Sequence, residues 1–212
     1  MLFLITAGPT REPIDPVRFL SNRSSGKMGY AIAQSALEAG HEVVLVSGPV
    51  AIAPPAGARV IQVITSDEMA EAVQSQIHSA DVLVMCAAVA DFKPAHYSLH
   101  KIKKQNAICN IELVPTRDIL ATIERPSRQM VIAGFAAETE SLSENALKKL
   151  REKKCDLIIG NDVSRMDAGL ESDDNELVLF FRNGETLVLP RESKLLLGRK
   201  LIKILEQIAE RN

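Results

Sequence analysis

Short runs of hydrophobic residues alternate along the chain with longer segments whose hydrophobic positions recur at the period of a helix. The short runs are nearly continuous, which is typical of parallel strands covered by helices on both faces. The predicted strands span Leu2–Thr6, Glu42–Val46, Val60–Ile64, Val82–Cys86, Met130–Phe135 and Leu157–Gly160. The predicted helices span Lys27–Ala39, Ser66–Ser79, Asp118–Glu124, Ser141–Lys153 and Lys194–Glu210. This alternation predicts an α/β fold with a Rossmann-like, mostly parallel sheet flanked by helices.

The ends of several elements carry local signals. Gly40 is expected to end the first helix, and Ser66 is expected to be the N-cap of the second. Near the carboxyl end, the runs Glu176–Phe181 and Thr186–Leu189 flank Asn183-Gly184, a dipeptide that favours the tight turn of an antiparallel hairpin. We therefore expect a β-hairpin at the edge of the sheet.

The composition indicates the cellular compartment of the protein and the kinds of partner that it could bind. Twenty-five basic and twenty-seven acidic residues give a net charge of −2, so bulk charge does not favour a nucleic acid or a membrane surface. The opening hydrophobic run is too short for a signal peptide or a membrane span, so a cytoplasmic location is expected. Cys86, Cys109 and Cys155 lack CxxC spacing, which fits a reducing compartment and argues against a zinc site. The length of 212 residues and the absence of a linker predict a single domain over residues 1–212.

The loop between the first strand and the first helix has the features of an anion site. It is long, contains several basic residues, and leads to Ser24, Ser25 and Gly26 at the predicted start of the helix. Free backbone N–H groups and the helix dipole favour a phosphate at such a position. The alternative is that the glycines serve only the packing of helix against strand.

Two familiar phosphate motifs are absent from this loop. A P-loop would need a glycine at position 21 and a serine or threonine at position 28, where Ser21 and Met28 stand. A GxGxxG dinucleotide fingerprint fails because Gly8 is followed by Pro9 and Thr10. Ordinary NAD binding is therefore disfavoured.

The carboxyl ends of two predicted strands hold further candidates. Ala87, Ala88 and Asp91 follow one strand, and Phe135 ends the next, at the edge where ligands bind in open α/β sheets. The run KIKK at residues 101–104 comes soon after, on a segment expected to be a mobile closing loop.

Lysines in these segments are suited to neutralising phosphates. Lys149 and Lys153 are four residues apart and share one helix face, and Lys101 opens the KIKK run. The alternative is that these charges only form solvated surfaces. Tyr97 and Lys101 also match the YxxxK pair of short-chain dehydrogenases, but the glycine motif and the upstream serine of that class are absent.

The run ITAGPTREPIDPVRFLSNRSSGKMG, followed in order by AAVAD, KIKK and GFAAET, resembles the bacterial phosphopantothenate–cysteine ligase family. The resemblance covers essentially the whole chain. It implies an enzyme of coenzyme A biosynthesis in which the carboxylate of 4'-phosphopantothenate attacks the α-phosphorus of CTP, releasing pyrophosphate. The amine of cysteine then opens the acyl-cytidylate and releases CMP. Mg²⁺ is expected with the CTP, and its protein ligands are not assignable from the sequence.

The resemblance also implies roles for particular residues. Asn22 would hold and activate the acyl-cytidylate, and Lys101 would serve the conversion of that intermediate. The CTP site would comprise Asp91, Lys101, Thr116, Arg117, Asp118, Ile119, Phe135, Lys149 and Lys153. The 4'-phosphopantothenate site would comprise Arg18, Gly26, Ala87 and Ala88. Thr116-Arg117 stands where the family often has Asn-Pro, which weakens the assignment of that segment.

The resemblance implies a homodimer whose phosphopantothenate site draws on both subunits. It also implies fusion to, or association with, a flavin-dependent phosphopantothenoylcysteine decarboxylase. Two other functions remain open at this point: an NAD(P)-dependent enzyme like the short-chain reductases, and a non-catalytic nucleotide-binding module on the same fold.

Overall fold

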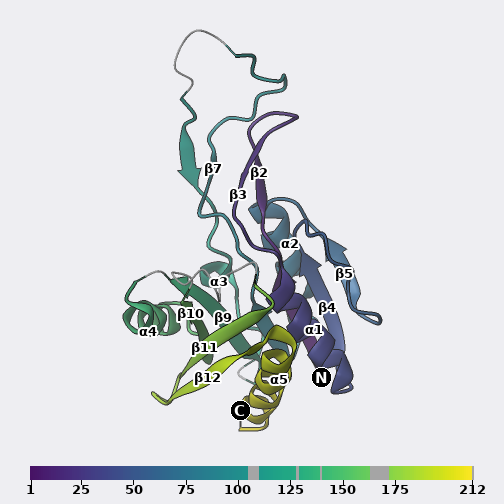
Figure 1. The fold of residues 1–212 in the computed structure, drawn as a ribbon, viewed down its shortest axis with the longest axis vertical. Coiled ribbons are helices and arrows are strands. Elements are labelled where there is room, and N and C mark those ends of the chain that lie inside the picture. Colours follow the sequence, from purple (N-terminus) through teal and green to yellow (C-terminus); the bar gives the residue numbers. More distant parts are fainter. Residues whose placement is uncertain (105–109, 128, 139, 163–171, 212) are drawn as a thin grey trace.

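The computed structural model describes residues 1–104, 110–127, 129–138, 140–162 and 172–211. Within these residues, eight strands form one sheet in the order β12-β11-β10-β9-β6-β1-β4-β5 (Figure 1). The parallel strands are β1 (Leu2–Ala7), β4 (Glu42–Ser47), β5 (Arg59–Gln62), β6 (Val82–Met85), β9 (Val131–Glu138) and β10 (Leu157–Asp162). The hairpin of β11 (Asp174–Phe181) and β12 (Thr186–Ser193) joins antiparallel at one edge. The predicted α/β fold and its edge hairpin are therefore confirmed.

Helices cover both faces of this sheet. Residues of α1 (Lys27–Glu38) and α5 (Lys194–Arg211) share one hydrophobic core cluster. Residues of α2 (Ser66–Gln76), α3 (Ile119–Thr122) and α4 (Leu142–Glu152) share the other. Successive residues of β1 alternate between the two clusters, as the pleat of a strand requires. Both faces of the sheet are thus buried, which explains its continuous hydrophobic runs.

Several predicted boundaries need correction. The strand predicted to reach Ile64 ends at Gln62, and the helix predicted over Asp118–Glu124 is a single turn, α3, with Asp118 as its N-cap. The second helix is capped by Thr65 and not by Ser66. Thr65 forms a capping box with Glu68, because the threonine hydroxyl accepts from the Glu68 N–H and the Glu68 carboxylate accepts from the Thr65 N–H. The 3-10 turn η1 (Ile77–Ser79) continues this helix.

The first helix ends as predicted at Gly40. This glycine follows the C-cap Ala39 and has a φ of +82°, in the left-handed region that favours glycine. The Gly40 N–H donates to the Leu37 carbonyl and the His41 N–H to the Ala36 carbonyl, both at 3.0 Å. These two bonds form the Schellman motif that ends a helix sharply.

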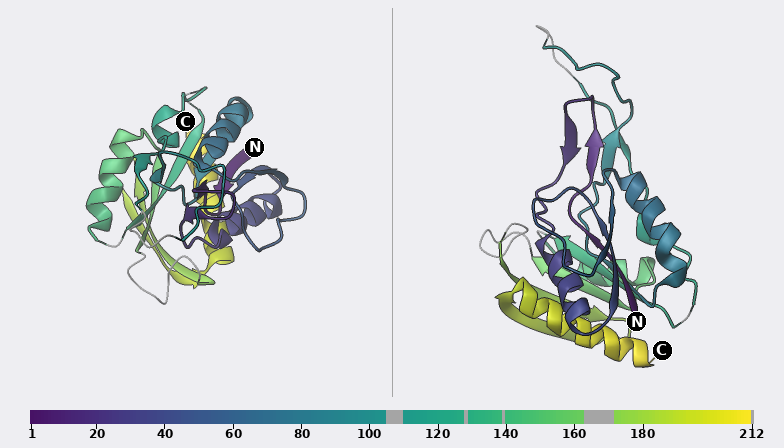
Figure 2. Two further views of the ribbon diagram at one scale, coloured as in Figure 1. Left: turned by 90° about the horizontal axis from the view of Figure 1, so that it is seen from above. Right: turned by 90° about the vertical axis from the view of Figure 1, so that its right-hand side faces the viewer.

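Two short hairpins project from the carboxyl edge of the sheet and were not predicted. They are β2 (Arg11–Pro13) with β3 (Phe19–Ser21), and β7 (Phe92–Pro94) with β8 (Leu113–Pro115). Figures 1 and 2 show them standing beyond the sheet, side by side; we call the described residues within 11–21 and 92–115 the arm. These strands have three residues each, and three of the four contain proline, so they carry too little periodicity to be recognised in a sequence.

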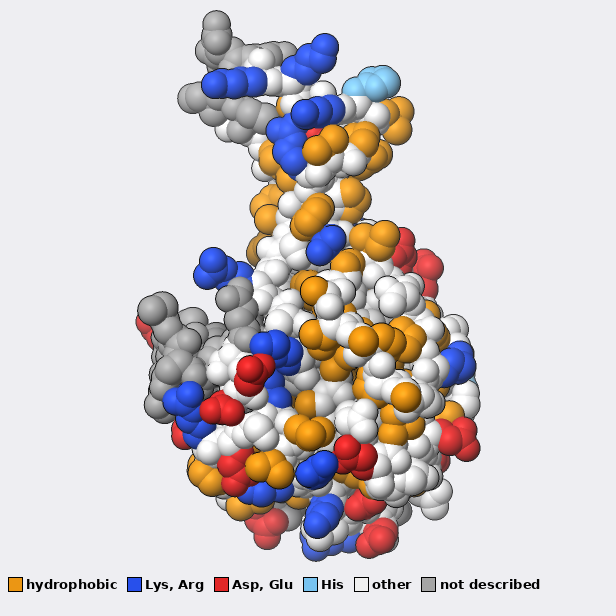
Figure 3. Space-filling view, turned by 45° about the vertical axis from the view of Figure 1, so that its right-hand side comes forward, with side chains coloured by type: hydrophobic (Ala, Val, Ile, Leu, Met, Phe, Trp, Pro, Cys, Tyr) orange, Lys and Arg blue, Asp and Glu red, His pale blue; other side chains and the backbone are white. Residues whose placement is uncertain are grey.

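The arm exposes large hydrophobic side chains. The exposed fraction is 48% for Phe19, 50% for Tyr97 and 78% for Leu99. Figure 3 shows hydrophobic side chains along the neck of the arm, with Lys and Arg side chains toward its tip. Contiguous exposed hydrophobic surface of this kind commonly marks a site of association.

A search of the described residues finds no helix with both the length and the hydrophobicity needed to span a membrane.

Replacement by alanine is predicted to destabilise the protein more at Gly48 than at Gly40. An alanine Cβ at Gly48 would lie 1.8 Å from the Pro9 carbonyl oxygen, whereas at Gly40 nothing lies within 4 Å. We expect Gly48→Ala to lower the free energy of unfolding by about 3 kcal/mol, because backbone must move. Gly40→Ala should cost about 1 kcal/mol, from its left-handed backbone alone. Urea denaturation of both variants checks this; equal losses would contradict it.

Candidate functional site

A cavity of about 470 Å³ opens at the carboxyl edge of the sheet, where α1 begins and β6, β9 and β10 end. The structure brings most of the predicted site residues together in its lining. These are Asn22, Gly26, Ala87, Ala88, Asp91, Thr116, Arg117, Asp118, Ile119, Phe135, Lys149 and Lys153. They come from five separate segments of the chain, so the sheet topology assembles the site.

Two predicted residues do not line the cavity. Lys101 and Arg18 both belong to the arm, outside the lining of the cavity in the same chain. The Arg18 guanidinium pairs with the Asp15 carboxylate at 2.9 Å and also donates to the Ile102 carbonyl. Within a single chain, Lys101 and Arg18 thus lie apart from Asp91 and Phe135, and their roles in the site stay predictions.

Two buried threonines of the first strand and its loop fix the segment that follows β6. The Thr6 hydroxyl accepts from the backbone N–H groups of Cys86 and Ala87, each at 3.1 Å. The Thr10 hydroxyl accepts from the Ala90 N–H at 3.0 Å. Sequence reasoning missed both residues, because a hydroxyl inside a hydrophobic strand shows its role only when its partner strand is known.

Asn22 is held in place by both ends of its amide. Its Nδ2 donates to the Ala88 carbonyl at 2.6 Å, and its Oδ1 accepts from the Ser24 N–H at 3.0 Å. The side chain therefore joins the loop before α1 to the loop after β6. An amide fixed in this way is preorganised to meet a ligand in the cavity.

The beginning of α1 faces the same cavity. Gly26 is its N-cap, with a φ of +76°, and no side chain caps this end. Gly26 also approaches Gly8 closely, since an added Cβ would lie 3.3 Å from the Gly8 Cα. The uncapped positive end of the helix dipole makes this part of the cavity favourable for an anion.

Another wall of the cavity carries Lys149 of α4 and Lys153, the C-cap of that helix. Lys149 donates to the Phe135 carbonyl at 2.7 Å, and Lys153 pairs with Asp118 at 2.6 Å. Burial alone would raise the pKa of Asp118, but the hydrogen bonds from Lys153 and the Ala121 N–H and the two lysine charges hold it below its usual range. Asp118 is thus ionised near neutral pH and keeps Lys153 directed along this wall.

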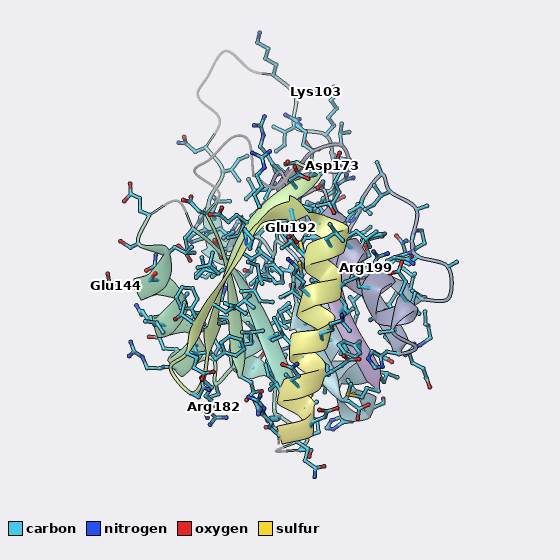
Figure 4. All side chains as sticks on the ribbon, turned by 60° about the horizontal axis from the view of Figure 1, so that its bottom comes forward. Lys103, Glu144, Asp173, Arg182, Glu192 and Arg199 are labelled. Atoms are coloured by element: carbon cyan, nitrogen blue, oxygen red, sulfur yellow. The ribbon has the colours of Figure 1, made fainter. Side chains whose placement is uncertain are left out.

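Several further lining residues were not assigned to the site from the sequence, among them Lys27, Asn161, Asn175 and Lys194. Lys194 is only 5% exposed and begins α5, and burial together with the nearby charge of Lys27 lowers its pKa. Figure 4 shows Asp173, whose carboxylate pairs with Lys27 at 2.6 Å, near the start of α5, and Lys103 farther out. Lys27 and Asn161 carried usable signals, because Lys27 stands beside Gly26 at the start of the first helix and Asn161 follows the hydrophobic run of β10.

The charge of the cavity differs from that of the whole chain. Among the described residues that line it, five are basic and two are acidic: Lys27, Arg117, Lys149, Lys153 and Lys194 against Asp91 and Asp118. The chain itself carries a net charge of −2. The cavity therefore concentrates positive charge and is suited to a polyanion.

Cys86 lines the cavity as a neutral group. Burial raises the pKa of its thiol to about 12, and the side chain packs against the hydrophobic core. Cys155 is buried, and burial raises its pKa to about 12 as well. Cys109 lies outside the described residues. The two described thiols thus behave as small hydrophobic residues.

A second hollow of about 910 Å³ is a weaker candidate. It is lined by the end of α4 and by residues 120–125, with Arg125 and Arg182 at its side. Both guanidinium groups are engaged by the buried carboxylate of Asp156, at 2.9 and 3.4 Å. Both guanidinium groups are therefore already engaged by a carboxylate of the chain itself.

Comparison with known proteins places the chain in a family. Residues 1–209 match the model of the DNA/pantothenate metabolism flavoprotein C-terminal domain. The chain belongs to this family. The coenzyme A biosynthesis bifunctional protein CoaBC of Bacillus subtilis (strain 168) is 45% identical over 207 residues, which are 97% of this chain and 50% of that protein. The CoaBC protein of Escherichia coli (strain K12) is 44% identical over 99% of this chain and 52% of its own length.

The family match extends to three-dimensional structure. The crystal structure of the C-terminal domain of a CoaBC protein superimposes with a TM-score of 0.84 and 41% identity, over 100% of this chain and 96% of that one. A Cab2 mutant in complex with phosphopantothenate-cysteine has a TM-score of 0.79 at 17% identity, a likeness that concerns the fold. The chain spans about half the length of the curated relatives that it matches.

Thr6→Val is predicted to loosen the cavity wall. Valine has the same shape but leaves the N–H groups of Cys86 and Ala87 without their acceptor, which should cost about 3 kcal/mol of stability. The control Thr6→Ser keeps the hydroxyl and should cost about 1 kcal/mol for the lost methyl group. Hydrogen exchange of these two amides should accelerate in the valine variant only. Equal exchange in both variants would show that the hydroxyl does not hold this segment.

Proposed function

We propose that this chain is a phosphopantothenate–cysteine ligase: it activates the carboxylate of 4'-phosphopantothenate with CTP and joins it to cysteine. The observation that carries the proposal is the convergence of Asn22, Asp91, Phe135, Lys149 and Lys153 on one positively charged cavity. Membership of a family whose relatives are named for coenzyme A biosynthesis supports the same reaction.

The reaction makes two demands that the cavity meets. A triphosphate needs positive charge where its oxygens lie, and the uncapped start of α1 and the cavity lysines supply it. The α-phosphorus and later the acyl carbon need a neutral group with both donor and acceptor capacity, and the Asn22 amide has both. Holding the carboxylate and the phosphorus in one cavity replaces a collision in solution by a positioned attack.

Mg²⁺ would accompany the triphosphate. Among the described residues, no group of three or more His, Cys, Asp or Glu side chains could hold a metal by itself. The ion would be bound mainly by phosphates and water, and Asp91 and Asp118 are the carboxylates among the described residues that line the cavity. When bound, the ion would neutralise charge on the phosphates.

The role proposed for Lys101 requires that this residue reach the cavity from outside its lining. Because Lys101 lies on the arm, it would reach the triphosphate through a movement of residues 101–104 or from the arm of a second copy. The exposed hydrophobic side chains of the arm support a homodimer, and Arg18 would then contribute to a phosphopantothenate site shared between subunits. A flavin-dependent decarboxylase would be a fused or associated partner, because the curated relatives are bifunctional and about twice as long.

The decisive assay is pyrophosphate release by the purified chain. We expect release to require 4'-phosphopantothenate, CTP and Mg²⁺ together, with CMP and the amide product appearing when cysteine is added. ATP in place of CTP should give at most about one tenth of the rate if the cavity selects the base. No release with any nucleotide would end the proposal.

The same preparation separates two rival functions. An NAD(P)-dependent reductase would enhance NAD(P)H fluorescence in a saturable way, and a non-catalytic module would bind CTP without turnover. Binding without turnover, or saturable nicotinamide binding, would replace the ligase by one of these.

Asn22→Asp is predicted to separate binding from chemistry. The substitution keeps the size of the side chain but replaces the N–H donor to the Ala88 carbonyl by an acceptor oxygen, while the lysines of the cavity remain to hold the triphosphate. We expect CTP affinity to change by less than about threefold and amide formation to fall by at least about a hundredfold. Asn183→Asp, at the distant β11–β12 turn, is the matched control. Unchanged turnover in Asn22→Asp would remove Asn22 from the mechanism.

A further inference from the structure

The arm contains a buried carboxylate whose bonds cross between its two hairpins. Asp15 lies between β2 and β3, and its side chain is 0% exposed. Its Oδ1 accepts from the backbone N–H groups of Val17 and Arg18, both at 2.8 Å. These two bonds belong to the local turn, which the Ile14 and Asp15 N–H groups also close by donating to the Arg18 carbonyl.

The second oxygen of Asp15 makes a contact far away in the sequence. Oδ2 accepts from the Ile102 N–H at 3.1 Å and pairs with the Arg18 guanidinium at 2.9 Å. The same guanidinium donates to the Ile102 carbonyl. Asp15 and Arg18 thus hold both backbone groups of one residue in the other hairpin.

Ile102 is the residue between two of the basic side chains singled out in the sequence. Lys101 precedes it and Lys103 follows it, and both are exposed. A second backbone bond, from the Ser98 N–H to the Ile14 carbonyl at 3.0 Å, joins the same two segments. The hydrogen bonds to the backbone of Ile102, and the bond between Ser98 and Ile14, therefore determine where the Lys101 and Lys103 ammonium groups lie.

We propose that Asp15 is a positioning residue that, together with Arg18, holds the backbone of Ile102 and so sets where Lys101 is presented. This inference rests on the proposed function, in which Lys101 serves the phosphates of CTP. It applies whether Lys101 reaches the cavity of its own chain or that of a second copy, because the bonds lie within one arm.

The charge state of Asp15 suits this role. Burial alone would raise the pKa of its carboxyl, but the three backbone N–H groups and the adjacent Arg18 charge outweigh burial and hold it below the usual range. The carboxylate is therefore ionised above its ordinary pKa of about 4. Its contribution is lost only as the pH falls through that lowered value.

Asp15→Asn separates the local turn from the long-range contact. The Asn oxygen can still accept from the Val17 and Arg18 N–H groups, so the turn is kept. Its NH₂ group would face the Ile102 N–H and the Arg18 guanidinium, which are both donors, so the contact with Ile102 is lost. Glu185→Gln, on the β11–β12 turn, is the control for loss of one negative charge.

Limited trypsin digestion tests the contact between Asp15 and Ile102 without an enzyme assay. Cleavage after Lys101 and Lys103 should be about tenfold faster in Asp15→Asn than in the unmodified chain or Glu185→Gln, because bonds to a charged group are lost. Cleavage after Lys148 and Arg151, in α4, is the internal reference and should not change. Equal rates after Lys101 and Lys103 in all three proteins would overturn the proposal.

Arg18→Lys provides a second variant in case Asp15→Asn fails to fold. Lysine keeps the charge beside Asp15 but cannot also reach the Ile102 carbonyl as the guanidinium does. We expect cleavage after Lys101 to be about threefold faster than in the unmodified chain. No change would count against the proposal.

A double-mutant cycle links the contact to Lys101 itself. Pyrophosphate release should fall in Asp15→Asn and in Lys101→Ala, and the double variant should be no slower than Lys101→Ala alone. Additive losses would show that Asp15 acts independently of Lys101 and would overturn its positioning role. If the unmodified chain releases no pyrophosphate, the proposed function fails, while the digestion still decides whether Asp15 holds the segment.

Discussion

The functional cavity depends on how the ends of two neighbouring strands are joined. β1 and β6 are parallel neighbours, and beyond their ends the Thr6 and Thr10 hydroxyls, the Asn22 amide and the backbone of Gly8 bind the segment from Cys86 to Ala90. Buried backbone N–H groups must find acceptors, and here two of the acceptors come from side chains. This arrangement joins the loops after β1 and β6 to each other along the wall of the cavity.

The charges around this cavity make it favourable for an anion. The uncapped start of α1 supplies a positive dipole end, and α4 and the start of α5 supply ammonium groups from other directions. Ion pairs with Asp118 and Asp173 hold Lys153 and Lys27 in fixed positions. A phosphate chain entering the cavity would meet charges that are already in place, which lowers the reorganisation needed for catalysis.

The sequence predicted the parts of this structure that depend on burial. The six parallel strands are hydrophobic runs because helices cover both faces of the sheet, and the Asn183-Gly184 turn and the Gly40 helix end follow from local backbone chemistry. The same logic placed Asp91 and Phe135 at the carboxyl edge. The order of motifs then indicated the family that the comparisons establish.

Other parts could not be predicted, for identifiable physical reasons. Thr65 rather than Ser66 caps α2 because Ser66 is fully buried and its N–H donates to Glu12, a contact 54 residues away. Lys194 and Asn175 reach the cavity only because the β11–β12 hairpin and α5 return to the same edge of the molecule. The arm places Lys101 away from the cavity because Asp15 and Arg18 hold its neighbour Ile102, a long-range contact that no local pattern encodes.

The central claim is that the cavity at the carboxyl edge of the sheet holds a nucleoside triphosphate beside Asn22. A crystal structure of the chain with CTP and Mg²⁺ tests it most directly. We expect the α-phosphate to lie within hydrogen-bonding distance of the Asn22 side chain and the start of α1. The nucleotide should also contact Phe135 and Lys149. Nucleotide density bound elsewhere, with this cavity filled only by solvent at saturating CTP, would contradict the account.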